Sequence, residues 1–200
     1  MCLRLSSFGI SLFVLLYLLA AYLYPGGSNF DQTAIGFSWQ YNYWCDLLSP
    51  MAKNGAMNQG QAIALIAMLI LATSVCLSWI GIFSKLPFQK TSSQYFQWSG
   101  ILSMAVAIFI FTTLHDLVII VAGGLALITL LALFVGLYKS NNAKLLYFGI
   151  GCLFLMGINN LIYFTGIGLD HLAVLQKLTF GLVLIWMLNL NYRFRKMAKT

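Results

Sequence analysis

The stretch 101–138, ILSMAVAIFIFTTLHDLVIIVAGGLALITLLALFVGLY, is apolar almost throughout and is interrupted by one histidine–aspartate pair, His115-Asp116. An α-helix rises about 1.5 Å per residue, so about 20 apolar residues cross a hydrocarbon core of about 30 Å. The stretch is therefore too long for one membrane span and long enough for two. We predict that His115-Asp116 forms the turn of a tight helical hairpin.

The composition of the whole chain indicates the same environment. Hydrophobic residues make up 61% of the 200 residues and charged residues 8%, whereas a soluble domain carries about 25% charged residues. A backbone in lipid must satisfy its own hydrogen bonds, which favours helices. We therefore predict an all-α, polytopic membrane protein.

Further apolar stretches extend this pattern to a bundle of six transmembrane helices in a single domain, residues 1–200. The predicted spans are 8–24, 62–83, 95–114, 117–138, 145–166 and 172–192. No convincing cleavage site follows the first stretch, so we expect a retained span and not a signal peptide. Glycines that would allow close helix approach are Gly123, Gly124, Gly149, Gly151 and Gly157.

The basic residues predict the orientation of these spans. Nine of the eleven fall on one side: Arg4, Lys85, Lys90, Lys139, Lys144, Arg193, Arg195, Lys196 and Lys199. Because lysine and arginine are enriched in cytoplasmic loops, we predict a multi-pass protein of the cytoplasmic membrane with both termini inside. Charge spread over helix ends argues against nucleic acid as a partner. We expect the basic tail to act as a topology anchor, and it could also favour anionic membrane lipids.

A single long connection, residues 25–57, lies on the predicted outer side. Its segment GFSWQYNYWCDLL, residues 36–48, spaces four apolar side chains as on one face of a short helix: Phe37, Tyr41, Trp44 and Leu48. Aromatic amphipathic helices commonly lie in the membrane interface. The alternative is a lid that directs Asp46 toward the outer helix turns.

The predicted outer side also holds all four aspartates and both histidines. His115-Asp116 and Asp170-His171 stand at two outer turns, and Asp46 could approach them from the loop. His115, His171 and Asp46 could bind a divalent metal such as zinc, and a histidine beside an aspartate could act as a general base. Alternatively, Asp116 and Asp170 only cap the helices that follow them.

Deeper polar residues complete a predicted outward-facing pocket. Asn159 and Asn160 in the fifth span, and Gln176 and Lys177 in the sixth, are costly in lipid unless they face the bundle interior. Lys177 could reach Asp46, Asp116 or Asp170, or it could extend to the interface. The pocket would bind a lipid headgroup or a small amphiphile. The alternatives are a metal-assisted hydrolase of outer-leaflet lipids and a small-solute transporter.

Three short motifs resemble a family of six-span bacterial membrane proteins, to which no activity is assigned and which is similar to the DRAM (damage-regulated autophagy modulator) type. The motifs are YNYWCDLL, NGAMNQG and LHDL, and they contain Asn42, Asp46, Asn54, Asn58, His115 and Asp116. The resemblance implies a six-helix fold in a membrane. The family commonly has serine near the aspartate of the first loop, where this chain has Cys45.

Overall fold

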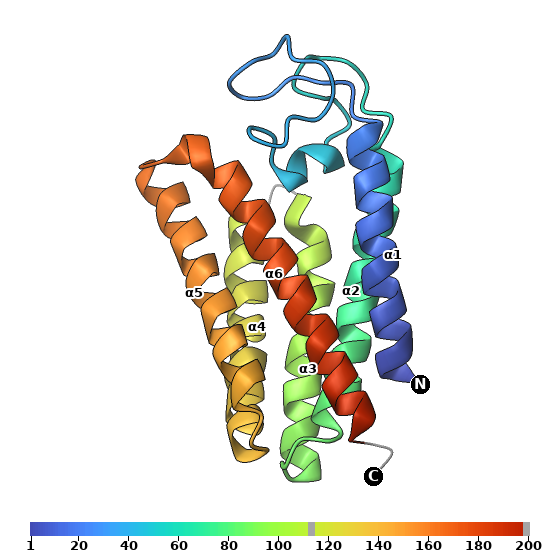
Figure 1. The fold of residues 1–200 in the computed structure, drawn as a ribbon, viewed down its shortest axis with the longest axis vertical. Coiled ribbons are helices and arrows are strands. Elements are labelled where there is room, and N and C mark those ends of the chain that lie inside the picture. The colour runs from blue at the N-terminus through green and yellow to red at the C-terminus, as the bar shows by residue number, and fades with distance from the viewer. Residues whose placement is uncertain (112–114, 198–200) are drawn as a thin grey trace. The chain divides into compact units, whose positions relative to one another are not determined.

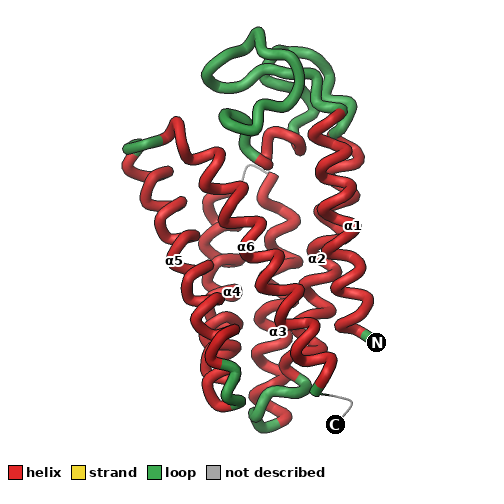
Figure 2. Tube along the Cα trace, viewed as in Figure 1, coloured by secondary structure: helices red, strands yellow, loops and turns green. Residues whose placement is uncertain are grey.

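The computed structural model describes residues 1–111 and 115–197, apart from the side chains of Ile110, Phe111, His115, Asp116 and Ile119. Within this part, six α-helices follow one another: α1 (Cys2–Tyr22), α2 (Gln61–Phe83), α3 (Lys90–Ala107), α4 (His115–Lys139), α5 (Ala143–Thr165) and α6 (Leu169–Lys196). Two short 3-10 helices, η1 (Trp44–Leu48) and η2 (Ile108–Phe111), complete the secondary structure (Figures 1 and 2). The predicted all-helical architecture is confirmed.

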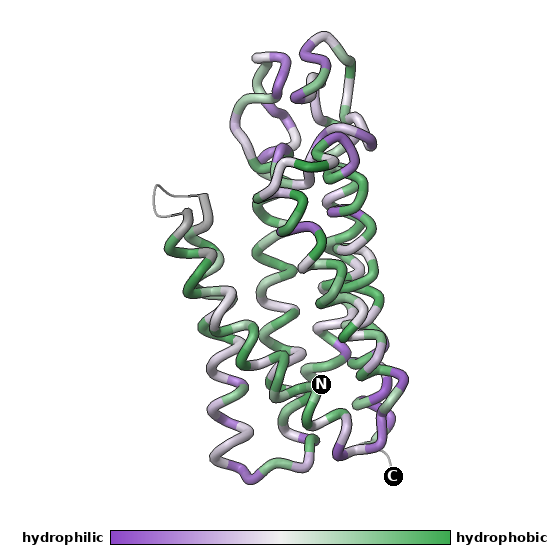
Figure 3. Tube along the Cα trace, turned by 90° about the vertical axis from the view of Figure 1, so that its left-hand side faces the viewer, coloured by the Kyte–Doolittle hydropathy of each residue, from purple (hydrophilic) through white to green (hydrophobic). Residues whose placement is uncertain are grey.

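Five of the described helices are long and apolar enough to cross a membrane: α1, α2, α4, α5 and α6. The three prolines, Pro25, Pro50 and Pro87, all lie in connections, so no helix is interrupted by a missing backbone N–H. Apolar residues continue along these helices, while hydrophilic residues gather in the loops (Figure 3). The helices therefore indicate a membrane protein.

The third predicted span differs most from the structure. Helix α3 begins at Lys90 and ends at Ala107, where the 3-10 helix η2 takes over, and α3 is not among the five most apolar helices. Helix α4 already includes His115 and Asp116, so the prediction that this pair forms the hairpin turn is wrong. The apolar run carries no residue that marks where one helix ends, which explains the misplaced boundary. Residues 112–114 lie outside the described part of the chain.

The chain divides into two compact units that share four helices. Unit 1 comprises Met1–Ile10, Leu71–Gly149 and Trp186–Thr200, and unit 2 comprises Ser11–Ile70 and Ile150–Ile185. Unit 1 thus contains all nine basic residues of the predicted cytoplasmic side. Unit 2 contains Lys53, Lys177 and three of the four aspartates.

Small hydroxyl side chains join the helices of unit 1. Ser99 and Ser103 of α3 donate hydrogen bonds to the carbonyl oxygens of Leu125 and Ala122 in α4, at 2.9 and 2.8 Å. A second cluster, fully buried, joins three helices: Ser6 of α1, Ser78 of α2 and Asn191 of α6 bond to one another at 2.6–2.9 Å. Buried polar groups of this kind are tolerated because each has a partner.

One of the predicted close glycine contacts is present. A Cβ on Gly149 would lie 2.4 Å from the ring of Trp186, so α5 and α6 approach closely at Gly149. Added Cβ atoms on Gly123, Gly124, Gly151 and Gly157 would meet no described atom within 4 Å, and the prediction does not hold there.

In unit 2, the closest backbone approach lies at Gly60, immediately before α2. A Cβ on Gly60 would lie 2.4 Å from the carbonyl oxygen of Ala20 in α1. Because that atom belongs to a helix backbone, it cannot move aside as a flexible side chain would. Glycine at this position therefore lets α2 start against α1.

We expect Gly60→Ala to lower the free energy of unfolding by about 1–3 kcal/mol, the usual effect of overpacking. Gly123→Ala is the matched control, because its added methyl group meets open space and alanine favours a helix. Unfolding of both variants in the same detergent measures the difference. Equal stability of the two variants would contradict the close approach.

Candidate functional site

The longest described connection, the 23–60 loop between α1 and α2, folds without extended helix. Only Trp44–Leu48 is helical, as η1, so the predicted amphipathic helix over 36–48 is wrong for its first part. The Asn42 side chain accepts a hydrogen bond from the backbone N–H of Ser38, and Asp46 accepts one from that of Tyr43. Such side-chain bonds compete with helical hydrogen bonding.

The four apolar residues of the predicted helix face do not share one face. Phe37 stacks on Trp44 with ring centroids 6.0 Å apart, whereas Tyr41 contacts Phe30 at 4.9 Å. Leu48 is buried. Trp44 also meets Trp39 edge to face at 5.7 Å, so the loop is held together by an aromatic cluster.

The side chain of Asn42 forms three hydrogen bonds within the loop, and the residue is fully buried. Its Nδ2 donates to the carbonyl oxygen of Gly27 at 2.8 Å and to Oδ2 of Asp46 at 3.0 Å. Its Oδ1 accepts from the N–H of Ser38 at 2.8 Å. One amide side chain therefore joins three separate parts of the loop.

Asp46 is buried and directed into the loop. Its Oδ2 accepts from Asn42 and from the N–H of Tyr43, and its Oδ1 lies 3.7 Å from Nζ of Lys53. The carboxylate is thus held by an amide, a backbone N–H and a cation. Asp46 maintains the loop structure, and it does not extend from the loop as a lid residue would.

Lys177 of α6 ties the loop to this helix. Its Nζ donates hydrogen bonds to the carbonyl oxygens of Asn42 and of Ala173, the second at 2.8 Å. The ammonium group also lies 5.6 Å from the centroid of the Phe37 ring. Of the predicted partners of Lys177, Asp46 is therefore close by, although the direct contact is with the backbone of Asn42.

Trp44 forms hydrogen bonds with two helices of unit 2. Its backbone carbonyl oxygen accepts a hydrogen bond from the hydroxyl group of Tyr17 in α1 at 3.0 Å. Its backbone N–H donates to Oε1 of Gln176 in α6 at 3.3 Å. One turn further along α6, Thr179 Oγ1 accepts from Nδ2 of Asn159 in α5 at 2.8 Å. Residues three apart lie on the same side of a helix, so Trp44 and Asn159 bind adjacent turns of α6.

These contacts define the α6 polar cluster, which consists of Asn42, Trp44, Asp46, Asn159, Gln176, Lys177 and Thr179. Two of its polar atoms are buried without a hydrogen-bond partner in the described structure, the donor Nε1 of Trp44 and the acceptor Oδ1 of Asn159. Unpaired buried polar groups are rare, and an ordered water, an ion, local strain or a functional role accounts for them.

The remaining predicted pocket residues contribute less to the cluster. Asn160 is exposed and bonds only its own helix, at Met156. Asp170 and His171 are exposed, and Nε2 of His171 lies 3.3 Å from Oδ2 of Asp170. Asp170 lies in the first turn of α6 and not before it, because Gly166 and Gly168, both with positive φ, complete the connection. The side chains of His115 and Asp116 lie outside the described part.

Among the described residues, no group of three or more histidine, cysteine, aspartate or glutamate side chains is placed to hold a metal ion. Asp46 already has protein partners, and His171 pairs with its neighbour. The predicted metal ligand His115 falls outside this set because its side chain is not described.

Four of the six residues named in the resembling motifs have a common role in the loop. Asn42, Asp46, Asn54 and Asn58 each accept a hydrogen bond from a backbone N–H of the loop. The sequence interpretation missed Thr179 as a member of the cluster and Tyr17 as a hydrogen-bond partner of Trp44. Tyr17 is one of several aromatic residues in an apolar helix, and nothing in its local sequence distinguishes it.

Comparison of the chain with known protein families, with curated proteins and with solved structures gives no match. The functional interpretation therefore depends on the site itself.

Proposed function

We propose that the chain is an integral protein of the cytoplasmic membrane with both termini inside and with six spans, the number that the resemblance to the DRAM type implies. The five apolar helices support five spans, and α3 continued by η2 would supply the sixth. Basic residues lie where α2, α4 and α6 end and where α1, α3 and α5 begin. With five spans these residues would be divided between the two sides of the membrane, so the sixth span fits the charge distribution better.

The topology predicts that an impermeant maleimide labels Cys45 in intact cells. Cys45 is exposed in the 23–60 loop, but the packing around its thiol and the charge of Asp46 raise its pKa. Because the thiolate is the reactive form, labelling should be slow at neutral pH and should accelerate as pH rises toward 9. Mass spectrometry of the labelled protein locates the adduct, and Cys45→Ser is the control. Labelling of Cys45 only after cell lysis would contradict the orientation.

We further propose that the α6 polar cluster binds a polar lipid headgroup or a small amphiphile. The unpaired atoms Trp44 Nε1 and Asn159 Oδ1 carry this proposal. The indole N–H requires an acceptor oxygen, and the amide oxygen requires an O–H or N–H donor. The headgroups of phosphatidylethanolamine and phosphatidylglycerol carry both an acceptor oxygen and an N–H or O–H donor. Such a headgroup would provide a partner for each of the two atoms. Phosphatidylcholine carries acceptor oxygens but no such donor.

Retention of individual lipids by the purified protein tests this proposal. We expect native mass spectrometry to show preferential binding of phosphatidylethanolamine or phosphatidylglycerol over phosphatidylcholine. Trp44→Phe should reduce the preferred binding about fivefold or more, since one hydrogen bond to a buried group is worth about 1–3 kcal/mol. Trp39→Phe is the matched control, because Trp39 belongs to the same aromatic cluster but is half exposed.

Two results would argue against the headgroup site. The first is equal binding of the three lipids by the unmodified protein, which would leave an ordered water as the partner of the two atoms. The second is an equal loss of binding in the two tryptophan variants, which would indicate a general effect on the aromatic cluster.

A further inference from the structure

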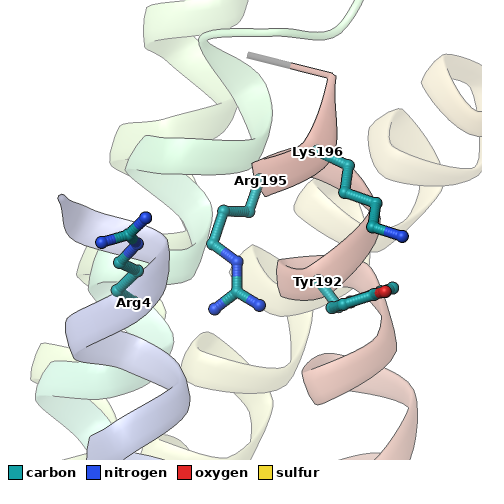
Figure 4. A pocket seen from close by; sticks show the side chains of 4 residues that line it. All are labelled: Arg4, Tyr192, Arg195 and Lys196. Carbon is teal, nitrogen blue, oxygen red and sulfur yellow. The ribbon is translucent and has the colours of Figure 1, made fainter. Parts of the chain in front are cut away.

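Two cavities open at the basic end of unit 1, where α1 begins and α6 ends. The first, of about 370 Å³, is lined by Arg4, Tyr192, Arg195 and Lys196 (Figure 4). The second, of about 500 Å³, shares Arg4 and Arg195 with the first and also has Lys85 in its wall. Ligand sites in proteins commonly measure about 300–1,000 Å³, so each cavity is large enough for a small anion with part of its carrier.

No aspartate side chain that the structure describes lies against the positive charge in these cavities. Neither cavity has an aspartate in its wall, and the described aspartate side chains, Asp31, Asp46 and Asp170, all belong to unit 2. The side chain of Arg4 forms no hydrogen bond or ion pair within the described part of the chain. Arg4 and Arg195 come from different helices and flank the same space, as Figure 4 shows. Like charges that flank one space are stabilised by an anion between them.

The other cations of the site contact uncharged groups, which position their side chains. Arg195 and Lys196 lie 5.5 and 4.7 Å from the ring centroid of Tyr192. Lys85 donates a hydrogen bond to the carbonyl oxygen of Phe194, which positions its ammonium group in the second cavity. Contact with a ring face leaves the guanidinium donors of Arg195 available to a ligand.

We infer that the basic end of unit 1 is a binding site for a phosphate group. Arg4 and Arg195 would donate paired hydrogen bonds to its oxygens, since the planar guanidinium group matches phosphate geometry. Lys196 and Lys85 would add charge, and Leu3 and Tyr192 would contact the apolar part of the carrier. The phosphate could belong to an anionic lipid headgroup or be free in solution, and both sources share this chemistry.

Membrane topology alone does not account for the arrangement. Lys90 and Lys144 lie at the corresponding ends of α3 and α5, and they satisfy the same charge rule. Neither residue lines either of these two cavities. Topology requires only that basic residues stay on one side, whereas Arg4 and Arg195 also share a concave space.

A pair of double variants tests the inference in the full-length protein. Arg4→Gln with Arg195→Gln removes two charges from the cavities, and Lys90→Gln with Lys144→Gln removes two charges outside them. Each protein is reconstituted in phosphatidylcholine nanodiscs, where its melting temperature verifies folding. Binding is then measured in two arms, by titration with inorganic phosphate and by exchange of a defined fraction of phosphatidylglycerol into the disc.

We expect the arginine pair variant to lose binding about tenfold or more in at least one arm, and the lysine pair variant to change less than about twofold. Loss in the phosphatidylglycerol arm alone identifies a lipid headgroup, and loss in the phosphate arm identifies a soluble phosphate. Equal losses in the two double variants, or no loss in either, would overturn the inference. If the arginine pair variant does not fold, Arg4→Gln alone provides the same comparison against Lys90→Gln, because Arg4 is exposed.

Discussion

Replacement of Asn42 by leucine is expected to lower the free energy of unfolding by about 3–5 kcal/mol. The change removes three hydrogen bonds of a fully buried amide, with Ser38, Gly27 and Asp46. The N–H of Ser38 and the carbonyl oxygen of Gly27 would then lose their partner, and a buried polar group without a partner costs about 1–3 kcal/mol. Leucine keeps the branched shape of asparagine but carries two bulkier methyl groups, so the change creates no cavity, and the effect combines lost hydrogen bonds with some overpacking.

Gln40→Leu is the matched control for this prediction. It makes a similar polar-to-apolar change two residues away, at an exposed position of the same loop. Denaturation of both variants in mixed detergents gives the difference in stability, and limited proteolysis reports opening of the loop itself. If Asn42→Leu resembled Gln40→Leu in both measurements, the central role of Asn42 in the loop would be wrong.

The helices could be predicted from the sequence because their physical cause is local. Long apolar runs without proline form helices in a membrane, and the predicted spans 62–83 and 145–166 differ from α2 and α5 by no more than two residues at either end. The third span was predicted less well. The first half of α3 contains Ser92, Ser93 and Gln94, so apolar length alone did not identify its start at Lys90.

The 23–60 loop could not be predicted in the same way. Its structure depends on side chains that bond distant backbone groups, such as Asn42 with Gly27 and Asn58 with Leu47. These pairs follow no helical or strand period. The spacing of Phe37, Tyr41 and Trp44 did match a helical period, but two buried polar side chains favoured a different backbone path.

Part of the candidate site was nevertheless visible in the sequence. Asn159 and Lys177 were identified because polar residues inside apolar helices require partners. The partners themselves were not predictable, since Lys177 meets the carbonyl oxygen of Asn42 across 135 positions of the chain. Of the carboxylates and imidazoles that were predicted to converge, the described cluster contains Asp46 alone, beside amides, Trp44, Thr179 and one lysine. The side chains of His115 and Asp116 lie outside the described part of the chain.

Lys177→Met should lower the free energy of unfolding by about 2–4 kcal/mol and release the 23–60 loop from α6. Methionine keeps most of the apolar stem but removes the hydrogen bonds to Asn42 and Ala173, and bonds from a charged donor are worth about 1.5–3 kcal/mol each. Part of this loss is offset because the ammonium group no longer has to be desolvated. Denaturation and proteolysis of the loop measure the two effects.

Lys53→Met is the control that distinguishes the hydrogen bonds of Lys177 from neutralisation of the Asp46 charge. Both lysines lie near Asp46, but Lys53 is partly exposed and 3.7 Å from the carboxylate, so its loss should cost no more than about 1 kcal/mol. If the two lysines only neutralised Asp46, the two variants would be equally destabilised and high salt would reduce both effects. If Lys177 instead extended to the membrane interface, Lys177→Met would leave the loop resistant to protease. We expect Lys177→Met to cause a large loss of stability that persists in high salt, and Lys53→Met to cause a small one. Of the two lysines, Lys177 is the one that bonds the backbone of both the loop and α6.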